Sequence, residues 1–216
     1  MKAVLFDLDG TLVDTAPDLA GALNKLLYEE GYPALPLDTI RPYVSKGGLA
    51  LTQLGFSALV AEVNIEPLRQ RLLTLYLNNI AEHSDLFKGF EETLKKLEEN
   101  NIIWGVVTNK PEFLTTPLMQ QLNLSDRSAT TISGDTTAQR KPHPLPLQTA
   151  AKAISINCED CLYVGDDQRD IIAGNAANMK TMIASYGYIF DKTGLNSWGA
   201  DAIIEQPLDL LTYLNL

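Results

Sequence analysis

Residues 2–15 read KAVLFDLDGTLVDT, and this stretch decides the fold. Its apolar run from Ala3 to Phe6 is typical of a buried strand. The strand runs directly into Asp7 and Asp9, and residues two apart on an extended chain point to the same face. Carboxylates held this close repel each other, and an unpaired charge near a core costs on the order of several kcal/mol. The sequence therefore predicts a compensating positive charge at the end of this strand.

The composition describes an ordinary globular protein with an acidic balance. The chain has 216 residues, of which 45% are apolar and 20% charged, and 17 basic side chains face 27 acidic ones for a net charge of −10. Such a length suits one large domain or one domain with an insertion. The acidic balance argues against a nucleic-acid partner, because phosphate backbones require basic patches. An anionic substrate must therefore be attracted locally, by a metal, a lysine or helix N-termini.

The sequence shows no targeting signal and no cysteine motif that indicates a specific function. No secretory signal precedes the first strand and no apolar run is long enough for a bilayer, so we expect a cytoplasmic protein without a membrane partner. Cys158 and Cys161 form a C-x-x-C that leads into a strand, and no second pair of zinc ligands accompanies it. We expect two reduced thiols. The oligomeric state, monomer or dimer, stays open.

Short apolar runs alternate with helical patterns along most of the chain, an order typical of a parallel sheet with helices on both faces. We therefore predict a doubly wound, Rossmann-like α/β fold. The predicted strands are Ala3–Phe6, Ile102–Val107, Thr130–Ile132, Cys161–Val164, Thr181–Ala184 and Ala202–Ile204. The predicted helices between them include Glu91–Asn100, Glu112–Leu122, Leu145–Ile154 and Arg169–Ala177.

One section breaks this alternation, because it shows helical periodicity and no strand pattern. Its first helix is predicted to begin with a capping box of Thr15 and Asp18 and to stop at Gly31. A second helix is predicted over Pro67–Ile80. The predicted organisation is a core of residues 1–14 and 85–216, with residues 15–84 inserted as a small all-α subdomain.

Polar residues gather where the predicted strands end, and in an open α/β sheet ligands bind at that edge. Three or more carboxylates that converge on one point favour a hard divalent cation, and oxygen-only ligands favour Mg²⁺. Such a cation, helped by a lysine, would offset the charge of the paired aspartates. The polar residues are Asp7 and Asp9, then Thr108, Asn109 and Lys110, then Asp166, Asp167 and Asp170, with Arg140 and Lys141 before a predicted helix.

Four motifs in this order resemble those of the haloacid dehalogenase-like hydrolases: DLDGT at 7–11, a strand-end threonine at 108, Lys-Pro at 141–142 and GDDQRD at 165–170. The resemblance covers essentially the whole chain, and the inserted helical section resembles the small helical cap of that family. DxDGT together with GDxxxD at this separation is a specific signal. The resemblance also implies a cap that opens over the site, with hinges near Asp14–Ala16 and Ser84–Gly89.

The resemblance implies a role for each matching residue. Asp7 would be the nucleophile that takes up a phosphoryl group as an aspartyl-phosphate, and a carboxylate with a reference pKa of about 3.9 is already ionised at neutral pH. Asp9 would protonate the leaving alkoxide and then accept a proton from the attacking water. The hydroxyl of Thr108, the backbone N–H of Asn109 and the ammonium of Lys141 would bind the phosphate oxygens.

The same resemblance implies a metal site. The Asp7 carboxylate, the Asp9 backbone carbonyl and Asp166 would hold Mg²⁺. Asp170 would orient either the water shell of the metal or the lysine of the third motif. Asp167 stands where family members often carry Ser or Thr, and a helix N-cap or a solvated acid explains it equally well.

The inserted section would read the rest of the substrate. Ser45-Lys46-Gly47-Gly48 resembles the cap loop that touches the leaving group, although a plain flexible turn explains it about as well. Lys46 and Arg41 are candidate cations for a substrate carboxylate. The overall pattern resembles phosphoglycolate phosphatases. IIWGVVTNKP, GDDQRDI, SYGY and NSWGAD resemble more closely the phosphatase that acts on N-acetylmuramic acid 6-phosphate in bacterial cell-wall recycling.

Other chemistries of the family are less favoured. Asp9 favours phosphoryl transfer over dehalogenation, because the dehalogenases lack this second aspartate. Lys46 lies in the section where phosphonate-cleaving relatives carry a Schiff-base lysine, but nothing else favours that chemistry. We therefore expect a Mg²⁺-dependent phosphatase for a small phosphorylated metabolite. A phosphomutase, which keeps the phosphoryl group for a second transfer, and a catalytically silent phosphate-binding module remain alternatives.

Overall fold

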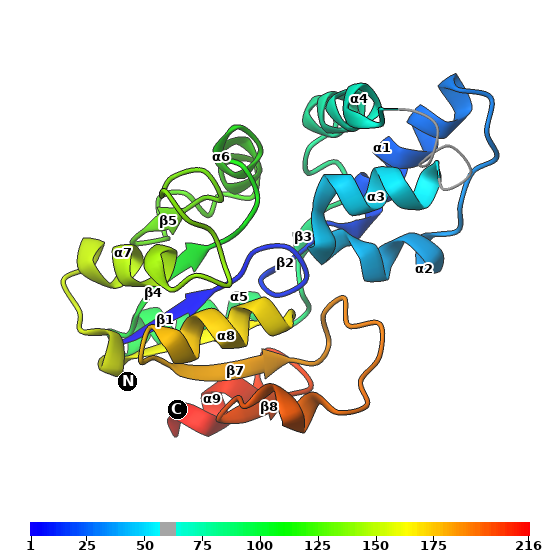
Figure 1. The fold of residues 1–216 in the computed structure, drawn as a ribbon. Coiled ribbons are helices and arrows are strands. Elements are labelled where there is room, and N and C mark those ends of the chain that lie inside the picture. The colour runs from blue at the N-terminus through cyan, green and yellow to red at the C-terminus, as the bar shows by residue number, and fades with distance from the viewer. Residues whose placement is uncertain (57–63) are drawn as a thin grey trace.

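The computed structural model describes residues 1–56 and 64–216, and its largest element is a parallel sheet (Figure 1). Within these residues the strand order is β5–β4–β1–β6–β7–β8, and every neighbouring pair is parallel. Each predicted strand is present to within one residue at either end, which confirms the predicted fold class. The strands are β1 (Ala3–Phe6), β4 (Ile103–Val107), β5 (Thr131–Ile132), β6 (Cys161–Gly165), β7 (Lys180–Ala184) and β8 (Ala202–Ile204).

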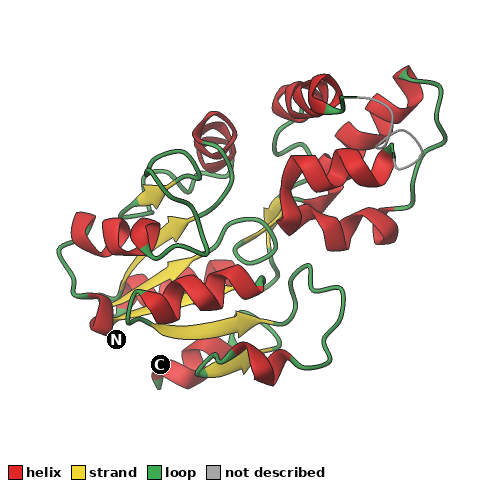
Figure 2. Ribbon diagram, viewed as in Figure 1, coloured by secondary structure: helices red, strands yellow, loops and turns green. Residues whose placement is uncertain are grey.

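Helices cover both faces of this sheet (Figure 2). The central strand β1 alternates between two apolar cores, with Val4 and Phe6 in one and Ala3 and Leu5 in the other. Side chains of α5, α6 and α9 complete the first core, and those of α7 and α8 complete the second. A strand buried on both faces is apolar throughout, which is the pattern that predicted it. The helices are α5 (Phe90–Glu99), α6 (Glu112–Gln121), α7 (Leu145–Ala153), α8 (Gln168–Ala176) and α9 (Asp209–Leu214), with 3₁₀ turns η2 (Cys158–Asp160) and η3 (Leu195–Trp198).

A second group of helices stands beside the carboxyl ends of the strands (Figure 1), and we call it the cap. It has an apolar core of its own, to which Leu23, Leu51 and Leu72 contribute from three different helices. Leu114 of α6 and Tyr188, which follows β7, also contact this core, so the cap packs directly on the sheet domain. The cap consists of α1 (Ala16–Glu29), α2 (Leu37–Ile40), the 3₁₀ helix η1 (Arg41–Lys46), α3 (Gly47–Gly55) and α4 (Glu66–Asn78).

The first cap helix ends as predicted but does not begin as predicted. Gly31 follows α1 with a φ of +78°, and its N–H bonds back to a carbonyl of the last turn, as in a glycine-terminated helix. The predicted capping box is wrong. The Thr15 hydroxyl donates to Asp9 Oδ1 at 2.6 Å, and Asp18 Oδ2 accepts from both the N–H and the hydroxyl of Ser84. Tertiary partners have replaced the local ones.

The cap joins the core through two chain crossings that pair with each other. β2 (Val13–Asp14) and β3 (Asp85–Leu86) form a two-stranded antiparallel sheet, in which Val13 pairs with Leu86 and Asp14 with Asp85. The sequence analysis did not predict these strands, because two residues carry no detectable period. The predicted domain boundaries, after residue 14 and before residue 85, fall on this pair, and hinge motion there stays a prediction.

Two further expectations concern the helices and the cysteines. In the part of the chain that the structure describes, none of the helices combines the length and the apolar character that crossing a bilayer requires. Both cysteines are free thiols, with Cys158 partly exposed and Cys161 buried at the start of β6. Burial is the main reason that the pKa of the Cys161 thiol rises to about 11, so this thiol stays protonated at neutral pH.

Candidate active site

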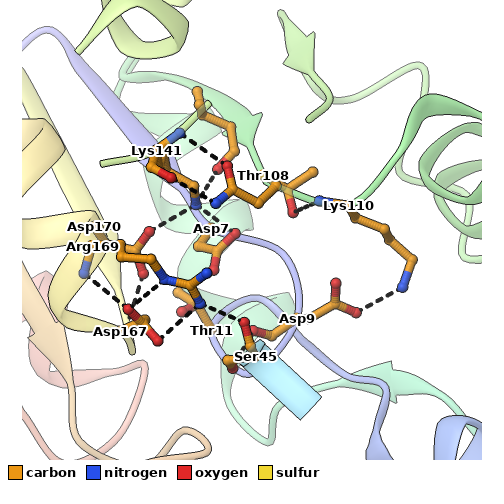
Figure 3. A network of polar contacts seen from close by, with 12 residues as sticks. Asp7, Asp9, Thr11, Ser45, Thr108, Lys110, Lys141, Asp167, Arg169 and Asp170 are labelled. Atoms are coloured by element: carbon orange, nitrogen blue, oxygen red, sulfur yellow. Dashed lines mark hydrogen bonds and ion pairs between the residues drawn. The ribbon is translucent and has the colours of Figure 1, made fainter. Parts of the chain in front are cut away.

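A cavity of about 250 Å³ lies between the carboxyl ends of the strands and the cap. Figure 3 shows that the side chains predicted to carry the chemistry point toward one another in this region. The cavity is therefore the place where the four motifs meet. Its lining includes Asp7, Asp9, Thr108, Asn109, Lys110, Lys141 and Asp170 from the core, and Lys46 and Arg69 from the cap.

Asp7 is the buried carboxylate at the end of β1. Its N–H continues the ladder to Val164 at 2.9 Å, which fixes the backbone where the strand ends. Its Oδ1 lies 2.9 Å from Lys141 Nζ, yet this contact lacks hydrogen-bond geometry, and Oδ1 has no hydrogen-bond donor among the described residues. Burial raises the pKa of Asp7 to about 7, and the Lys141 charge offsets only part of that rise. Full ionisation of Asp7 at neutral pH therefore needs more positive charge than Lys141 alone supplies.

Lys141 is buried among oxygen acceptors. Its Nζ lies 2.7 Å from Asp170 Oδ1 and donates to the Val107 carbonyl at 3.0 Å and to the Tyr163 hydroxyl at 2.7 Å. Burial by itself would lower the pKa of this ammonium, but the carboxylates of Asp170 and Asp7 outweigh burial and raise it. Lys141 is thus a fixed positive charge, and the resemblance-based role of Asp170, orienting the lysine, agrees with this contact.

The Asn109 side chain hydrogen-bonds to the backbone of Lys141. Its Nδ2 donates to the Lys141 carbonyl at 2.9 Å, and its Oδ1 accepts from the Lys141 N–H at 3.0 Å. Thr108, at the end of β4, accepts a bond from the Lys110 N–H on its hydroxyl at 3.1 Å. Besides the expected backbone N–H, the Asn109 side chain therefore ties the loop after β4 to the loop that carries Lys141.

Asp9 has a lysine of its own. Lys110 Nζ donates to Asp9 Oδ1 at 2.9 Å, and the Thr15 hydroxyl donates to the same oxygen. The Lys110 ammonium also stands 4.5 Å from the ring centre of Tyr76 in α4. Burial alone would lower the pKa of Lys110, but Asp9 and Tyr76 outweigh burial and raise it. The two aspartates that opened the sequence analysis are thus compensated by two different lysines.

Asp166 follows β6 and is almost fully buried. Its carboxylate accepts from the Thr11 hydroxyl at 3.1 Å, the Tyr188 N–H at 2.8 Å and the Ser45 hydroxyl at 2.9 Å. Burial, reinforced by the nearby carboxylates, raises its pKa well above the usual range. Gly10 lies against it, and a Cβ at that position would come within 2.3 Å of Asp166 Oδ2. Only glycine fits there, which explains the fourth position of DLDGT.

The three acids fit a divalent cation. Asp7, Asp166 and Asp170 each offer a carboxylate oxygen, and these oxygens all lie within 4.8 Å of one another. Asp7 Oδ1 lacks a donor, and burial raises the pKa of both Asp7 and Asp166. A bound cation would give Asp7 Oδ1 a partner and would lower the pKa of both carboxylates. Hard cations also prefer a set of ligands made only of oxygen atoms.

Asp167 caps a helix. Its side chain accepts from the Arg169 N–H at 2.9 Å and caps the N-terminus of α8, which is one of the two alternatives that the sequence left open. The Arg169 guanidinium pairs with the same carboxylate, with Nε 2.8 Å from Oδ1. Arg169 Nη2 also donates to the backbone carbonyl of Ser45 at 2.6 Å, which is a bond from the core to the cap.

The two cap residues predicted to bind a substrate carboxylate, Lys46 and Arg41, lie in different places. Lys46 lines the cavity, and its Nζ lies 5.0 Å from the ring centre of Tyr43. Arg41 lies elsewhere: it pairs with Asp14 at 2.8 Å and stacks on Tyr188, outside the lining of the cavity. The expectation that Arg41 reads the substrate therefore has no support here, because its guanidinium is already engaged at the base of the cap.

Sequence reasoning missed several contacts of the site. Lys110 was noted without a role, although its place directly after the Thr-Asn pair at a strand end was a usable signal. Ser45 was noted only as part of a loop. The contacts of Arg169 and the lining position of Arg69 depend on how the cap docks, and no local pattern reports docking.

Comparison with known proteins agrees with these motifs. The family model for haloacid dehalogenase-like hydrolases matches residues 4–184. A phosphoglycolate phosphatase of Xanthomonas campestris pv. campestris (strain 8004) is 45% identical over 209 residues, which cover 97% of this chain and 94% of the relative. An N-acetylmuramic acid 6-phosphate phosphatase of Pseudomonas putida is 42% identical over 210 residues, with the same shares covered.

Solved structures share the architecture. The crystal structure of a predicted phosphoglycolate phosphatase from Haemophilus somnus superposes with a TM-score of 0.87 at 26% identity, covering 99% of this chain and 98% of that one. The match includes the cap as well as the sheet domain, because it spans nearly the whole chain. Since the family model covers most of its length and full-length relatives share more than two fifths of its residues, the chain belongs to the haloacid dehalogenase-like hydrolase family.

Proposed function

We propose that this hydrolase is a Mg²⁺-dependent phosphatase that removes phosphate from a small phosphomonoester through an aspartyl-phosphate on Asp7. The enzyme class, a phosphoric monoester hydrolase, follows from the family and from the two phosphatase relatives. Two free thiols suit the reducing cytoplasm as its compartment. The observation that supports the mechanism best is the buried Asp7 carboxylate, which lines the cavity and has the fixed charge of Lys141 2.9 Å from its Oδ1.

In the first half-reaction, an oxygen of the Asp7 carboxylate attacks phosphorus and the bond to the leaving alkoxide breaks. Asp9 gives that alkoxide its proton. Lys141 lies beside the attacking carboxylate and stabilises negative charge on the transferring phosphoryl group. The Thr108 hydroxyl and the Asn109 N–H orient the phosphoryl oxygens. The product of this step is an alcohol and an aspartyl-phosphate.

In the second half-reaction, water attacks the aspartyl-phosphate and Asp9 takes the proton that the water loses. The bond between phosphorus and the Asp7 oxygen breaks, which releases inorganic phosphate and restores the carboxylate. Lys110 and Thr15 both donate to Oδ1 of Asp9, so Oδ2 carries neither bond and is the oxygen that exchanges the proton. Proton transfer of this kind contributes about 10²- to 10⁴-fold.

The metal site that we propose uses the Asp7 carboxylate, the Asp9 backbone carbonyl and Asp166. Mg²⁺ bound there supplies charge neutralisation for the carboxylate and the phosphoryl group that must approach each other. The chain contributes the rigid placement of these oxygens. Asp166 is fixed by three donors, and Asp170 holds Lys141 so that the lysine does not swing toward solvent.

The substrate class that we propose is a small phosphomonoester with a carboxylate. Both phosphatase relatives are named for substrates that are carboxylic acids, phosphoglycolate and a muramic acid phosphate. Lys46 lines the cavity from the cap and makes no ion pair within the described residues, so its charge is available to such a group. The cavity of about 250 Å³ suits the smaller acid, since sites for drug-sized ligands span roughly 300–1,000 Å³. The sugar phosphate would need a more open cap.

Phosphate release from a substrate panel tests this proposal. The panel contains phosphoglycolate, N-acetylmuramic acid 6-phosphate and simple hexose phosphates, with Mg²⁺ or with EDTA, for wild type and Asp7→Asn. We expect turnover of one acid that needs the metal and is lost in Asp7→Asn. Turnover that survives EDTA or the loss of the Asp7 carboxylate contradicts the mechanism. Release that depends on an added bisphosphate activator would favour the phosphomutase alternative instead.

A further inference from the structure

Ser45 brings a hydroxyl from the cap onto the groups that we propose as metal ligands. It lies on η1, close to Asp9 in Figure 3. Its Oγ donates to Asp166 Oδ2 at 2.9 Å and approaches the Asp9 backbone carbonyl at 3.3 Å. Ser45 belongs to the cap and Asp166 follows β6 of the core, so this contact exists only while the cap is docked. The mechanism described above counts this bond among the three that fix Asp166, but it gives no role to the fact that the donor belongs to the cap.

The backbone of the same residue is held by the core. Arg169 Nη2 donates to the Ser45 carbonyl at 2.6 Å, and the guanidinium is itself fixed by two contacts to Asp167, at 2.8 Å from Nε and 3.0 Å from Nη2. Asp167 in turn caps α8, and it directly follows Asp166 in the chain. Two bonds from one short stretch of the core therefore converge on a single cap residue, one to its side chain and one to its carbonyl.

We propose that Ser45 is a positioning residue that couples docking of the cap to binding of the metal. Its hydroxyl orients the Asp166 carboxylate as a hydrogen-bonding partner of a metal ligand, and Arg169 holds Ser45 in the place where it can do so. This inference rests on the proposed function, because it takes Asp166 and the Asp9 carbonyl to be metal ligands. Loss of a hydrogen-bonding partner of a metal ligand typically costs about 10- to 100-fold in metal affinity.

The coupling works in both directions. If a docked cap raises the affinity of the site for the cation, the bound cation must favour the docked cap by the same factor. Metal-free protein should therefore expose η1 more often than protein with Mg²⁺. The neighbouring Lys46 provides a contrast, because its contacts in the structure are with Tyr43 and the cavity, and none reaches a proposed metal ligand.

The test measures Mg²⁺ binding to the full-length protein by isothermal titration calorimetry, without substrate. Ser45→Ala removes the hydroxyl, and Arg169→Gln removes the guanidinium while leaving the N–H that Asp167 caps. Thr74→Ala is the matched control, since it deletes a cap hydroxyl whose bond stays inside α4. We expect the Mg²⁺ dissociation constant to rise about tenfold in Ser45→Ala and less in Arg169→Gln. Thr74→Ala should bind like wild type.

Hydrogen exchange of the backbone amides in residues 41–46 gives a second readout. We expect Mg²⁺ to slow exchange there in wild type and in Thr74→Ala but not in Ser45→Ala. A Ser45→Ala protein that binds Mg²⁺ within about twofold of wild type, or whose η1 amides are protected by Mg²⁺ as in wild type, overturns the inference. Wild-type protein that binds no Mg²⁺, or Asp166→Asn protein that binds it normally, would instead overturn the proposed metal site.

Discussion

Lys141 and Lys46 face the same cavity from opposite sides, and their surroundings differ. The Lys141 side chain is 2% exposed and is held by carboxylates, a carbonyl and a tyrosine hydroxyl. Lys46 is exposed and rests on one aromatic ring. The Lys141 ammonium is thus buried and fixed by several partners, whereas the Lys46 side chain is solvent-exposed and has one aromatic neighbour. Side chains that stabilise phosphoryl transfer need fixed positions and a low dielectric constant around them. Side chains that bind the variable part of a substrate do not.

Replacing Lys141 should have the largest effect. In Lys141→Met, the carboxylates of Asp7 and Asp170 lose their shared buried cation, and breaking a buried ion pair costs about 3–5 kcal/mol. We expect urea unfolding at pH 8 to show a loss of that size, and kcat/KM to fall at least about 10³-fold. The stability loss should shrink at pH 5.5, because Asp7, whose pKa burial raises to about 7, is then protonated. An equal loss at both pH values would contradict the charge argument.

Replacing Lys110 should impair the step that uses Asp9. Lys110→Met leaves the Asp9 carboxylate with the Thr15 bond alone, so the carboxylate loses part of its fixed orientation. We expect kcat to fall about 10- to 100-fold with a smaller change in KM, because a positioned acid–base group acts in the transition state. Steady-state kinetics measures both constants. The exposed Lys95→Met is the matched control, and a similar fall in that variant would assign the effect to net charge.

Metal and pH should act together on thermal stability. Folding raises the pKa of Asp7 from 3.8 to about 7, so the metal-free folded protein holds more protons than the unfolded chain in that interval. Its stability therefore falls as pH rises toward and through 7. Mg²⁺ should raise the Tm more at pH 8 than at pH 5.5, by several degrees in a thermal melt with and without EDTA.

Asp7→Asn sharpens that comparison. It removes the charge without changing the shape, so the metal-free variant should melt above metal-free wild type at pH 8, and the two should converge at pH 5.5. A variant that melts below wild type at pH 8 would show that the Lys141 pairing outweighs the cost of burying the carboxylate.

Replacing Lys46 should have the smallest effect. An exposed ion pair is worth about 0.2–1 kcal/mol, so Lys46→Met should raise KM for phosphoglycolate about two- to fivefold and leave the urea midpoint unchanged. KM for ethyl phosphate, which has no carboxylate, should not change. If both substrates lose affinity equally, Lys46 contributes general attraction and does not read the carboxylate.

The sheet and the core side of the site were predictable because their signals are local. A strand buried on both faces is apolar throughout, and the residue after its last apolar position falls at the ligand-binding edge. That reasoning located Asp7, Thr108 and Asp166. Lys141 was noted before a predicted helix, and the resemblance gave it its phosphate-binding role. Both aspartates needed compensation. The sequence analysis expected one lysine beside a metal, and the structure places two lysines there, Lys141 at Asp7 and Lys110 at Asp9.

The cap side was less predictable because its contacts are tertiary. Thr15 and Asp18 have the spacing of a capping box, but neither bonds within the helix. Thr15 donates to Asp9, six residues earlier in the chain, and Asp18 accepts from Ser84, 66 residues later. Arg41 was one of two candidate cations for a substrate carboxylate, and in the structure it pairs with Asp14 at the base of the cap. Ser45 gained its importance only from docking. Spacing along a helix does not report which distant acceptor a side chain will meet.

The short pair β2–β3 has a consequence for how such proteins diversify. The two crossings between core and cap run side by side as neighbouring antiparallel strands, whose Cα atoms lie about 4.5–5.5 Å apart. The core is therefore connected to the cap at one place, where the two chain crossings are neighbours. Any folded insert whose two ends lie that close together can be joined to the core there. A different lid, or a tight turn in its place, would leave the register of β1 with β4 and β6 untouched. Substrate specificity can therefore change by replacement of the whole inserted domain, while the catalytic residues of the core stay in place.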